Sequence, residues 1–388
     1  MSAGTKRIFI SDIHMGDQRS MGQPPSRSHP YGWLQKNIPT LTKFLRDKLQ
    51  AEDVGDVIVL GDLFDQWVIP SNQDPLATVT DICSNPANKG IIDNLKELAR
   101  SSKLSYVPGN HDMSACQEDL PILKSFINAT FPGIHFICDD DQPAGVYRKD
   151  NLVAEHGNMH CLFNAPDRWS APGSFLPLGY FISRMVAYKV AETGQPENVL
   201  DILFKFILEF SGKPNFIYDL FLAVADDARL KKTDKIRMGN MNGFGETITI
   251  DEVASQYVEL IRNWDEHHVK ISSPIAITDD CGELLEAAFK LYLGPGTSPD
   301  IDIAIFGHTH AWRNEDPYPL LDENVREGGP SLSPSACKAI YANSGTWVDS
   351  THHCTYVETE VDEENQLHYV RVKSYPGDIL LQERFVAL

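Results

Sequence analysis

The chain has 388 residues, a formal net charge of −20 at pH 7, 42% hydrophobic residues and 23% charged residues. These are globular values, which argue against a disordered or fibrous protein, and the length predicts one large domain or two. Because an acidic protein repels polyanions, the charge argues against a general coating of DNA or RNA. It leaves room for a small phosphorylated substrate at a locally positive site.

The seven cysteines are an odd number, and none of them forms a Cys-x-x-Cys pair. This pattern argues against a zinc finger or a redox motif and favours reduced thiols in the cytoplasm. The sequence shows neither a secretory signal nor a run of about 20 apolar residues that could cross a membrane. We therefore expect a cytoplasmic protein without a transmembrane segment, and we leave its oligomeric state open.

Strand-like and helix-like segments alternate in the first part of the chain. Apolar or β-branched runs predict strands, and apolar residues at helical spacing predict the helices between them. The predicted strands are 7–14, 56–60, 104–107, 134–138 and 151–154, and the predicted helices are 38–49, 91–100 and 120–127. This alternation is typical of an α/β fold in which helices connect the strands of one sheet.

Residues 157–300 have a different character, because most of them follow helical periodicity. Strand patterns return at 301–306 and continue through three further runs, at 339–342, 354–361 and 368–374. We therefore predict that 1–156 and 301–388 form one α/β core, and that 157–300 form a mostly helical insertion that caps it. The apolar faces of the cap helices are interpreted as the cap's own core, with a pocket for an acyl chain or a base as the alternative.

Polar residues gather in five short motifs that follow predicted strands, where open α/β sheets place their ligand sites. Asp, His and Asn side chains supply the oxygen and nitrogen donors that suit divalent Mn, Fe, Zn or Ni. Because residues i and i+2 of a strand point the same way, two pairs could each aim at one place. The motifs are Asp12-Ile13-His14, Gly61-Asp62-Leu63-Phe64-Asp65, Gly109-Asn110-His111-Asp112, Glu155-His156-Gly157-Asn158 and Gly307-His308-Thr309-His310.

Together, and in this order, the five motifs resemble those of the calcineurin-like metallophosphoesterase family. The resemblance covers the residues outside 157–300. It implies a four-layer α/β/β/α sandwich with a site for two divalent metal ions at the strand ends. By position, Asp62 would bridge the two ions. One ion would also be held by Asp12, His14 and His310, and the other by Asn110, His156 and His308.

The resemblance also implies a reaction, the hydrolysis of a P–O bond by a hydroxide that bridges the two metal ions. His111 follows the ligand Asn110, so it is expected to hang over the site. It resembles the catalytic histidine of the family, which contacts the phosphoryl group or protonates the leaving oxygen. Asp65 is similar to the acid that orients this histidine in some members. The substrate is expected to be a small phosphorylated molecule, with monoester, diester and pyrophosphate all open.

Two alternatives accompany this reading. The segments 61–67 and 156–158 resemble those of the UDP-diacylglucosamine pyrophosphohydrolases, although His111 stands where those enzymes usually have Arg and this chain is considerably longer. The first alternative is therefore a pyrophosphohydrolase whose nucleotide-diphosphate or lipid-linked substrate is held by the cap. The second is a catalytically silent scaffold of the same fold that binds proteins.

Three further segments carry weaker signals. The loop 15–33 follows the first motif, and Arg19 or Arg27 in it could bind phosphate, although the loop could equally be a surface excursion. Five basic residues within 229–237 could attract an anionic group or form a solvated helix end. Residues 343–346 are predicted to close a strand near the site in a structural role.

Overall fold

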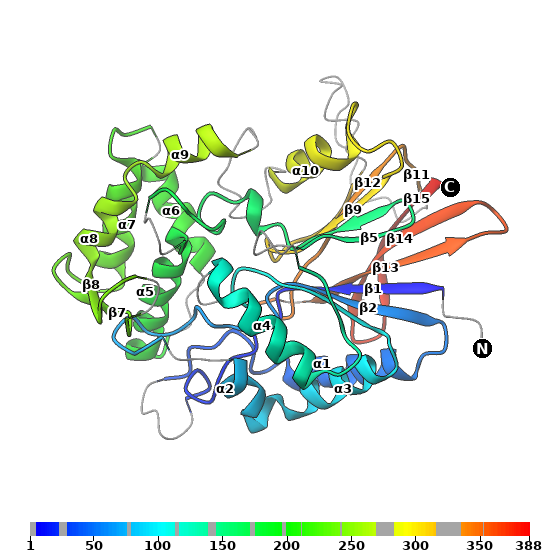
Figure 1. Ribbon diagram of the computed structural model, residues 1–388, viewed down its shortest axis with the longest axis horizontal. Helices are drawn as coiled ribbons and strands as arrows, with labels where there is room; N and C mark the ends of the chain where they lie inside the picture. The colour runs from blue at the N-terminus through cyan, green and yellow to red at the C-terminus, as the bar shows by residue number, and fades with distance from the viewer. Residues whose placement is uncertain are drawn as a thin grey trace.

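The computed structural model describes most of the chain. The described residues are 5–22, 29–75, 79–112, 116–138, 145–170, 175–195, 199–210, 212–240, 243–268, 283–315, 335–351 and 353–388. Two sheets and the helices on their outer faces form the core, and a group of helices lies at one end of it (Figure 1). None of the helices within the described ranges is long and apolar enough to cross a membrane.

The larger sheet has eight strands in the order β11-β15-β14-β13-β1-β2-β3-β4. The first four strands of the chain are parallel, whereas β13, β14 and β15 form an antiparallel meander joined to β1. Their bounds are β1 Lys6–Ile10, β2 Val54–Leu60, β3 Leu104–Val107, β4 His135–Phe136, β11 Ser335–Ala336, β13 Cys354–Asp362, β14 Leu367–Tyr375 and β15 Ile379–Ala387. Six predicted strands are found in this sheet, although two of them are shorter than predicted, at β1 and β4, whereas β11 and β15 have no counterpart in the prediction.

The smaller sheet has five strands in the order β10-β12-β9-β6-β5. Its strands come from both ends of the chain, because β6 and β12 lie on either side of β9 and are parallel to it. Their bounds are β5 Tyr147–Lys149, β6 Leu152–Ala154, β9 Ile303–Phe306, β10 Trp312–Glu315 and β12 Ile340–Ser344. The N- and C-terminal parts of the predicted core therefore share one sheet.

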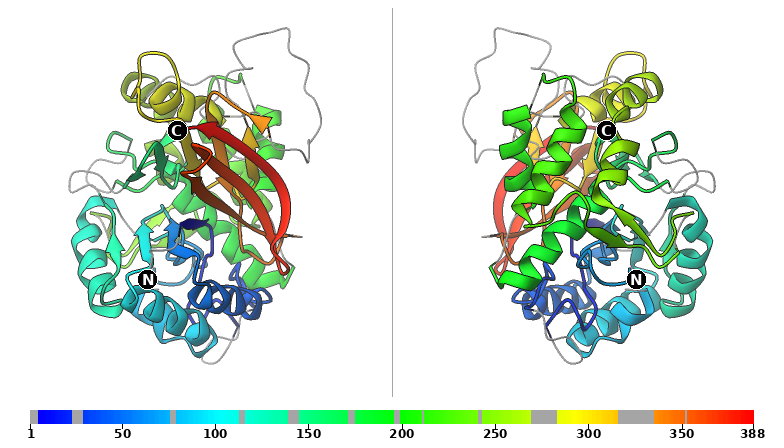
Figure 2. Two further views of the ribbon diagram at one scale, coloured as in Figure 1. Left: turned by 90° about the vertical axis from the view of Figure 1, so that its right-hand side faces the viewer. Right: turned by 90° about the vertical axis from the view of Figure 1, so that its left-hand side faces the viewer.

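Apolar side chains from both sheets meet between them, and helices cover the outer faces. Phe9 and Ile58 of the larger sheet pack with Ile303 and Ile340 of the smaller one in a single buried cluster. Helices of the N-terminal half cover the larger sheet; their bounds are α1 Ile38–Gln50, α2 Val79–Ser84, η1 Pro86–Asn88, α3 Lys89–Arg100 and α4 Cys116–Thr130. These helices and the helix that covers the smaller sheet, described next, lie on opposite sides of the two sheets (Figure 2). The protein is an α/β/β/α sandwich.

The fourth layer comes from the end of the predicted insertion. Helix α10 (Glu283–Ala288) and the π-helical turn η3 (Phe289–Leu293) cover the outer face of the smaller sheet. Leu284 and Leu293 pack there against Phe306 of β9 and Tyr341 of β12. This part of 157–300 therefore packs on the sandwich, apart from the other inserted helices.

The remaining helices of 157–300 lie at the end of the sandwich (Figure 1) and share one apolar cluster, which also includes Tyr31, Trp67 and Val68 from the loops after β1 and β2. Phe181, Met185, Leu220, Phe221 and Val253 are all buried in this cluster, as the helical spacing predicts. The elements are η2 Asn158–His160, α5 Leu178–Thr193, α6 Val199–Phe210, α7 Phe216–Asp227, β7 Lys235–Arg237, β8 Thr247–Thr249, α8 Ile250–Gln256 and α9 Leu260–His267. The described apolar residues of α5, α7 and α8 in this cluster therefore pack against one another.

One detail of the cap prediction is wrong. The spacing of Val253, Tyr257, Leu260 and Ile261 in the sequence suggests one further helix with these residues on one face, but α8 ends at Gln256 and α9 begins at Leu260. The turn between them changes the buried face, so that Ile261 is 38% exposed while Leu260 is buried. When a turn separates two helices, the buried positions of the second need not continue the spacing of the first, and periodicity alone does not reveal this.

A buried arginine connects the cap to the core. Arg184 of α5 is completely buried, and its guanidinium donates hydrogen bonds to the carbonyl oxygens of Ile69, Pro70, Gln73 and Arg237. The first three of these belong to the segment after β2. Because a buried guanidinium must have its donors satisfied, this side chain fixes α5 against that segment.

Candidate metal centre

The structure brings together all seven candidate ligands. Each of them follows the carboxyl end of a strand: β1, β2 or β3 of the larger sheet, or β6 or β9 of the smaller sheet. The loops after β1 and β2 are joined by main-chain hydrogen bonds, in which the N–H groups of Ile13 and His14 both donate to the carbonyl oxygen of Asp62. These bonds hold the first two motifs side by side.

Five of these seven residues have a left-handed backbone. The φ angles are 53° at Asp12, 54° at His14, 53° at Asp62, 74° at His308 and 61° at His310. Non-glycine residues adopt this region at a cost, and such residues cluster at functional sites. The pairs Asp12/His14 and His308/His310 therefore converge through this conformation. The strand alternation from which we expected their convergence is the wrong reason, because β1 ends at Ile10 and β9 at Phe306.

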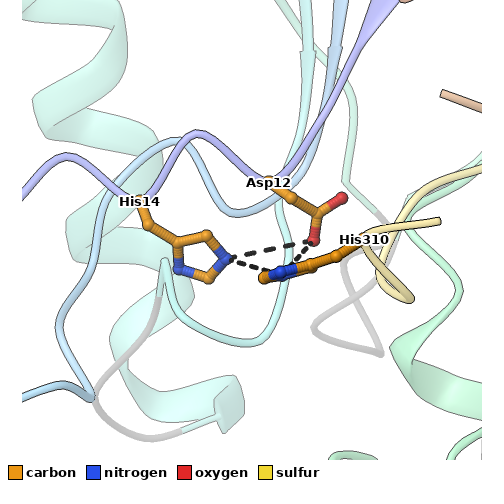
Figure 3. Close-up of side chains that lie close together, drawn as sticks. All are labelled: Asp12, His14 and His310. Atoms are coloured by element: carbon orange, nitrogen blue, oxygen red, sulfur yellow. Dashed lines mark hydrogen bonds and ion pairs between the residues drawn. The ribbon is translucent and has the colours of Figure 1, made fainter. Parts of the chain in front are cut away.

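The first group of donors consists of Asp12, His14 and His310, whose side chains point toward one another (Figure 3). His310 Nε2 lies 3.3 Å from Asp12 Oδ1 and 3.2 Å from His14 Nε2. Asp12 Oδ1 is buried and has no hydrogen-bond partner. A buried anionic oxygen without a donor needs a positive charge nearby, and two converging imidazole nitrogens complete a donor set that fits a divalent cation.

A second group of donors consists of Asp62, His156 and His308. Asp62 Oδ2 lies 3.2 Å from His156 Nε2 and 3.6 Å from His14 Nε2, so this carboxylate faces both groups. The carbonyl oxygen of the Asn110 side chain lies 3.1 Å from His156 Nε2 and adds a neutral donor. The geometry thus places Asp62 between two sets of oxygen and nitrogen donors.

Glycines make this close approach possible. A Cβ atom on Gly109 would lie 2.2 Å from Asp62 Oδ1, and a Cβ atom on Gly61 would lie 2.4 Å from His156 Nδ1. Gly61 also has a left-handed φ of 76°. Since real Cβ atoms do not come this close to other atoms, only glycine fits at either position.

The charges of the site keep the carboxylates of Asp12 and Asp62 ionised. Burial alone would raise the pKa of Asp12, but the nearby imidazoles of His310 and His156 lower it to about 2. Burial opposes ionisation of Asp62 in the same way, yet the charges of His156 and His111 bring its pKa well below the ordinary value. The carboxylate oxygens of both Asp12 and Asp62 are therefore available as anionic donors at neutral pH.

The histidines of the second group differ from each other. Burial and the charge of His156 lower the pKa of His308 to about 3, so His308 is neutral and offers a lone pair. Burial would also lower the pKa of His156, but the charge of Asp62 and their hydrogen bond raise it to about 10. A cation that takes a lone pair of His156 must therefore displace a proton.

Asp65 and His111 lie beside the first group. His111 Nδ1 is 3.0 Å from Asp65 Oδ1, and His14 Nδ1 is 3.4 Å from Asp65 Oδ2. Burial would lower the pKa of His111, but the charges of Asp65 and Asp62 raise it. Asp65 thus contacts both the histidine that it is predicted to orient and one candidate ligand.

Asp112 holds the second and third motifs together, a role that the sequence did not reveal. Its carboxylate accepts hydrogen bonds from the main-chain N–H groups of Asp62 (2.8 Å), Phe64 (2.8 Å) and Gly109 (2.7 Å). All of these groups are buried. The carboxylate therefore fixes the backbone on both sides of the shared Asp62, although only its place in the Gly-Asn-His-Asp motif could have drawn attention to it.

Three further side chains near the site were also missed. The imidazole of His111 lies between the indoles of Trp33 and Trp67, at ring-centroid distances of 5.3 and 4.6 Å. On the other side of the site, Asn164 Nδ2 lies 3.2 Å from His308 Nε2. Trp67 could have been found from its place in the segment 61–67, whereas Trp33 and Asn164 stand in loops without a ligand-like spacing.

The weaker predictions have mixed outcomes. Arg19 forms an ion pair with Asp17 at 2.7 Å, and none of its described contacts involves a candidate ligand. Arg27 lies outside the described residues. Residues 343–346 do lie at the site, because Asn343 donates to the carbonyl oxygen of Gly307 and Thr346 donates to that of Asp12.

Comparison with protein families decides the identity of the chain. The family model described as calcineurin-like phosphoesterase matches residues 5–204, which is more than half of the chain. The chain belongs to the calcineurin-like phosphoesterase family. This is a family of phosphoesterases whose members bind divalent metals, and the described residues of this chain include Asp/His groups able to hold such ions. The matched range enters the predicted cap.

Curated relatives in three strains of Coxiella burnetii carry the name UDP-2,3-diacylglucosamine hydrolase. Each is 26% identical to this phosphoesterase over 158 residues, which are 40% of this chain and 47% of the relative. The chain therefore spans about half the length of the curated relatives it matches. This is a weak similarity to hydrolases of a nucleotide-diphosphate sugar.

Proposed function

We propose that this phosphoesterase binds two divalent metal ions and uses them to hydrolyse a P–O bond of a small phosphorylated substrate. The observation that carries the proposal is the position of Asp62, whose Oδ2 atom lies 3.6 Å from His14 and 3.2 Å from His156. One carboxylate between two histidine-containing donor groups is an arrangement that serves a pair of cations.

The proposed ligand sets follow from the two groups of donors. Asp12, His14 and His310 would hold one ion, and Asn110, His156 and His308 the other, with Asp62 shared by both. Mixed imidazole and oxygen donors suit Mn, Fe, Zn or Ni. When bound, such ions polarise a phosphoryl oxygen and lower the pKa of water.

His111 is proposed as the group that holds a proton for the leaving oxygen. Its Nδ1 atom faces Asp65, and its main-chain N–H donates to Asp62 Oδ1 at 2.8 Å. The nearby carboxylates raise the pKa of the imidazole, so it is protonated over a wider pH range than an ordinary histidine. Asp65 orients the ring and stabilises its positive charge, which leaves Nε2 to donate to the substrate.

The domain division remains part of this proposal. We propose that 1–156 and 301–388 form the catalytic core and that 157–300 is the insertion whose cap helices, α5 to α9, limit which substrates reach it. The hydrogen bonds of Arg184 to the segment after β2 support a fixed position of the cap next to Asp65 and Trp67. We further propose that the protein acts in the cytoplasm.

A pyrophosphohydrolase is the second candidate function. The similarity to the UDP-2,3-diacylglucosamine hydrolases favours it, because a bond in a nucleotide-diphosphate substrate would be cleaved by the same donor groups. It predicts faster cleavage of a nucleotide-diphosphate substrate than of a simple aryl phosphate. A silent scaffold is not favoured, since the donor groups are complete and the family is one of hydrolases.

The test combines metal analysis with turnover. We expect protein reloaded with Mn²⁺ to hold two ions per chain and to hydrolyse at least one of an aryl monophosphate, an aryl diester, a cyclic nucleotide and a nucleotide-diphosphate sugar lipid. Replacement of His111 by Ala should lower kcat about 100-fold or more while both ions stay bound. His353, an exposed histidine before β13, provides the matched control, because H353A should change neither quantity.

Two outcomes would contradict the proposal. Failure of the reloaded protein to hold more than one ion per chain would remove the shared role of Asp62. Unchanged turnover in the His111→Ala variant would remove His111 from the reaction, whatever the metal content.

A further inference from the structure

Trp33 is an aromatic side chain at the metal centre to which the proposed reaction gives no role. Its indole lies 4.6 Å from the ring of His14, 5.3 Å from that of His111 and 5.9 Å from that of His310, measured between ring centroids. It therefore contacts two proposed metal ligands and the proposed proton donor, which come from three separate loops.

The exposure of Trp33 differs from that of the groups it covers. The side chain of His14 is fully buried and that of His111 is 7% exposed, whereas Trp33 is only partly buried. Trp67, the indole on the other side of His111, is buried in the core of the cap. Trp33 thus keeps part of its surface accessible to solvent, and Trp67 does not.

The main chain holds Trp33 in this position. Its carbonyl oxygen accepts a hydrogen bond from the N–H of Asp349 at 2.8 Å, and the two preceding residues, Tyr31 and Gly32, both donate to the carbonyl oxygen of Ser20. The indole also packs against the cap's apolar cluster. Because its backbone and one part of its ring are anchored, the indole can serve as a fixed surface for a ligand.

The two sides of the centre have different chemistry in the described part of the chain. Trp33 lies beside His14, His310 and His111, whereas the amide of Asn164 lies beside His308. If His111 gives its proton to the leaving oxygen, the leaving group must lie beside His111. A leaving group in that place lies close to the indole of Trp33, whose ring centroid is 5.3 Å from that of His111.

From this arrangement we propose that Trp33 is a specificity-determining residue, whose indole stacks on a planar aromatic ring in the leaving group of the substrate. The inference rests on the proposed function, because it places the leaving group beside His111. Aromatic pairs prefer offset-stacked or edge-to-face contacts at ring-centroid distances of about 4.5–7 Å, and a saturated ring of the same size does not gain this contribution. The substrate class is therefore a phosphate ester of an aromatic alcohol.

The experiment compares two esters that differ only in this property. Benzyl phosphate and cyclohexylmethyl phosphate both release a primary alcohol, so their leaving groups have similar basicity while only one ring is aromatic. Both are assayed as monoesters and as methyl diesters with the Mn²⁺-loaded enzyme. We expect wild type to favour the benzyl ester by about 3- to 10-fold in kcat/KM, the range of an aromatic pair.

Variants then assign this preference to Trp33. In W33L the ratio should fall to about 1, and in W33F about half of the preference should remain, since a smaller aromatic ring is kept. The control is W169L, because Trp169 is a partly exposed tryptophan that stacks on His267 of the cap. It should keep the wild-type ratio. Binding of benzylphosphonate and cyclohexylmethylphosphonate, measured by calorimetry, should show the same order without any turnover.

The outcomes separate this inference from the proposed function. Turnover of both esters with a ratio near 1 in wild type, or an equal loss for both esters in W33L at full metal content, overturns the stacking role and leaves the proposed function standing. Absence of turnover for these esters by wild type that hydrolyses another substrate of the panel above overturns this inference alone, and absence of turnover for every panel substrate as well, with two ions bound, overturns the proposed function with it. Equal binding of the two phosphonates by wild type overturns the stacking role independently of catalysis.

Discussion

Replacement of Asp112 tests how the backbone of the metal centre is held. Its carboxylate accepts three buried main-chain N–H groups, those of Asp62, Phe64 and Gly109. Each buried donor left without an acceptor costs about 1–3 kcal/mol, so Asp112→Ala should lower the free energy of unfolding by about 3 kcal/mol or more. Asp112→Asn keeps one acceptor oxygen and turns an NH₂ group toward the remaining donors, so it should cost about half as much.

The same change should weaken metal binding, because Asp112 holds the loops that carry Asp62 and Asn110. Changes to groups that orient metal ligands typically cost about 10–100-fold in affinity, and we expect a loss in this range for Mn²⁺. Urea denaturation in the presence of a chelator measures the stability term alone, and calorimetric Mn²⁺ titration measures the affinity.

Asp56 provides the matched control. It is a largely buried carboxylate on β2 whose pKa is raised mainly by burial, and it accepts hydrogen bonds from Ser105 and Tyr147. Asp56→Asn should change stability without changing Mn²⁺ affinity. If Asp112→Ala unfolds at the wild-type urea concentration and binds Mn²⁺ within twofold of wild type, then the three N–H bonds do not support the centre and the reasoning fails.

Three further predictions concern the cap, the core and the glycines. Arg184→Met should lower the free energy of unfolding by about 3 kcal/mol or more in urea, because four carbonyl oxygens lose their buried donor; a wild-type midpoint would contradict this. Burial and the charge of Arg7 lower the pKa of His368 to about 4. Below about pH 6.5 the unfolded chain therefore binds a proton on His368, whereas the folded chain binds it only near pH 4. The free energy of unfolding should therefore fall by about 2–3 kcal/mol between pH 6.5 and 4.5. Denaturation of His368→Gln across this range should show a smaller fall, and an identical fall would refute the assignment. Finally, a Cβ on Gly109 would lie 2.2 Å from Asp62 Oδ1, whereas a Cβ on Gly245 would meet no atom within 4 Å. Gly109→Ala should therefore lose bound metal in elemental analysis, and Gly245→Ala should not; equal metal contents would show that the loop can move aside.

Much of the fold could be predicted because the spacing of apolar residues within a short segment indicates whether that segment forms a strand or a helix. The runs that became β1, β2, β3, β6 and β9 carry continuous apolar residues, and each ends in a polar motif. The order of these motifs identified the family, which the comparison with known families confirmed. Side-chain chemistry and chain order are properties of the sequence itself, so they can be read before any contact is known.

The pairing of the last strands could not be predicted in this way. Most residues of strand β15 are exposed or half-buried, with Ile379 58% exposed, and the strand belongs to the larger sheet only through its pairing with β14 and β11. In the same way, the periodicity of 283–293 is helical like that of the cap, yet these residues cover the smaller sheet. Which face a segment covers depends on its partners, which are remote in the sequence.

By itself, the sequence determined which side chains are available to bind metal and where along the chain they stand. Only the tertiary structure decided how they converge, because Asp12, His14 and Asp62 reach their places through left-handed backbone conformations that main-chain hydrogen bonds between separate loops sustain. It also decided which other groups stand beside them. Trp33 and Asn164 have no distinctive spacing, and the contacts of Asp112, although it belongs to a motif, form only once distant strands have been paired and buried together.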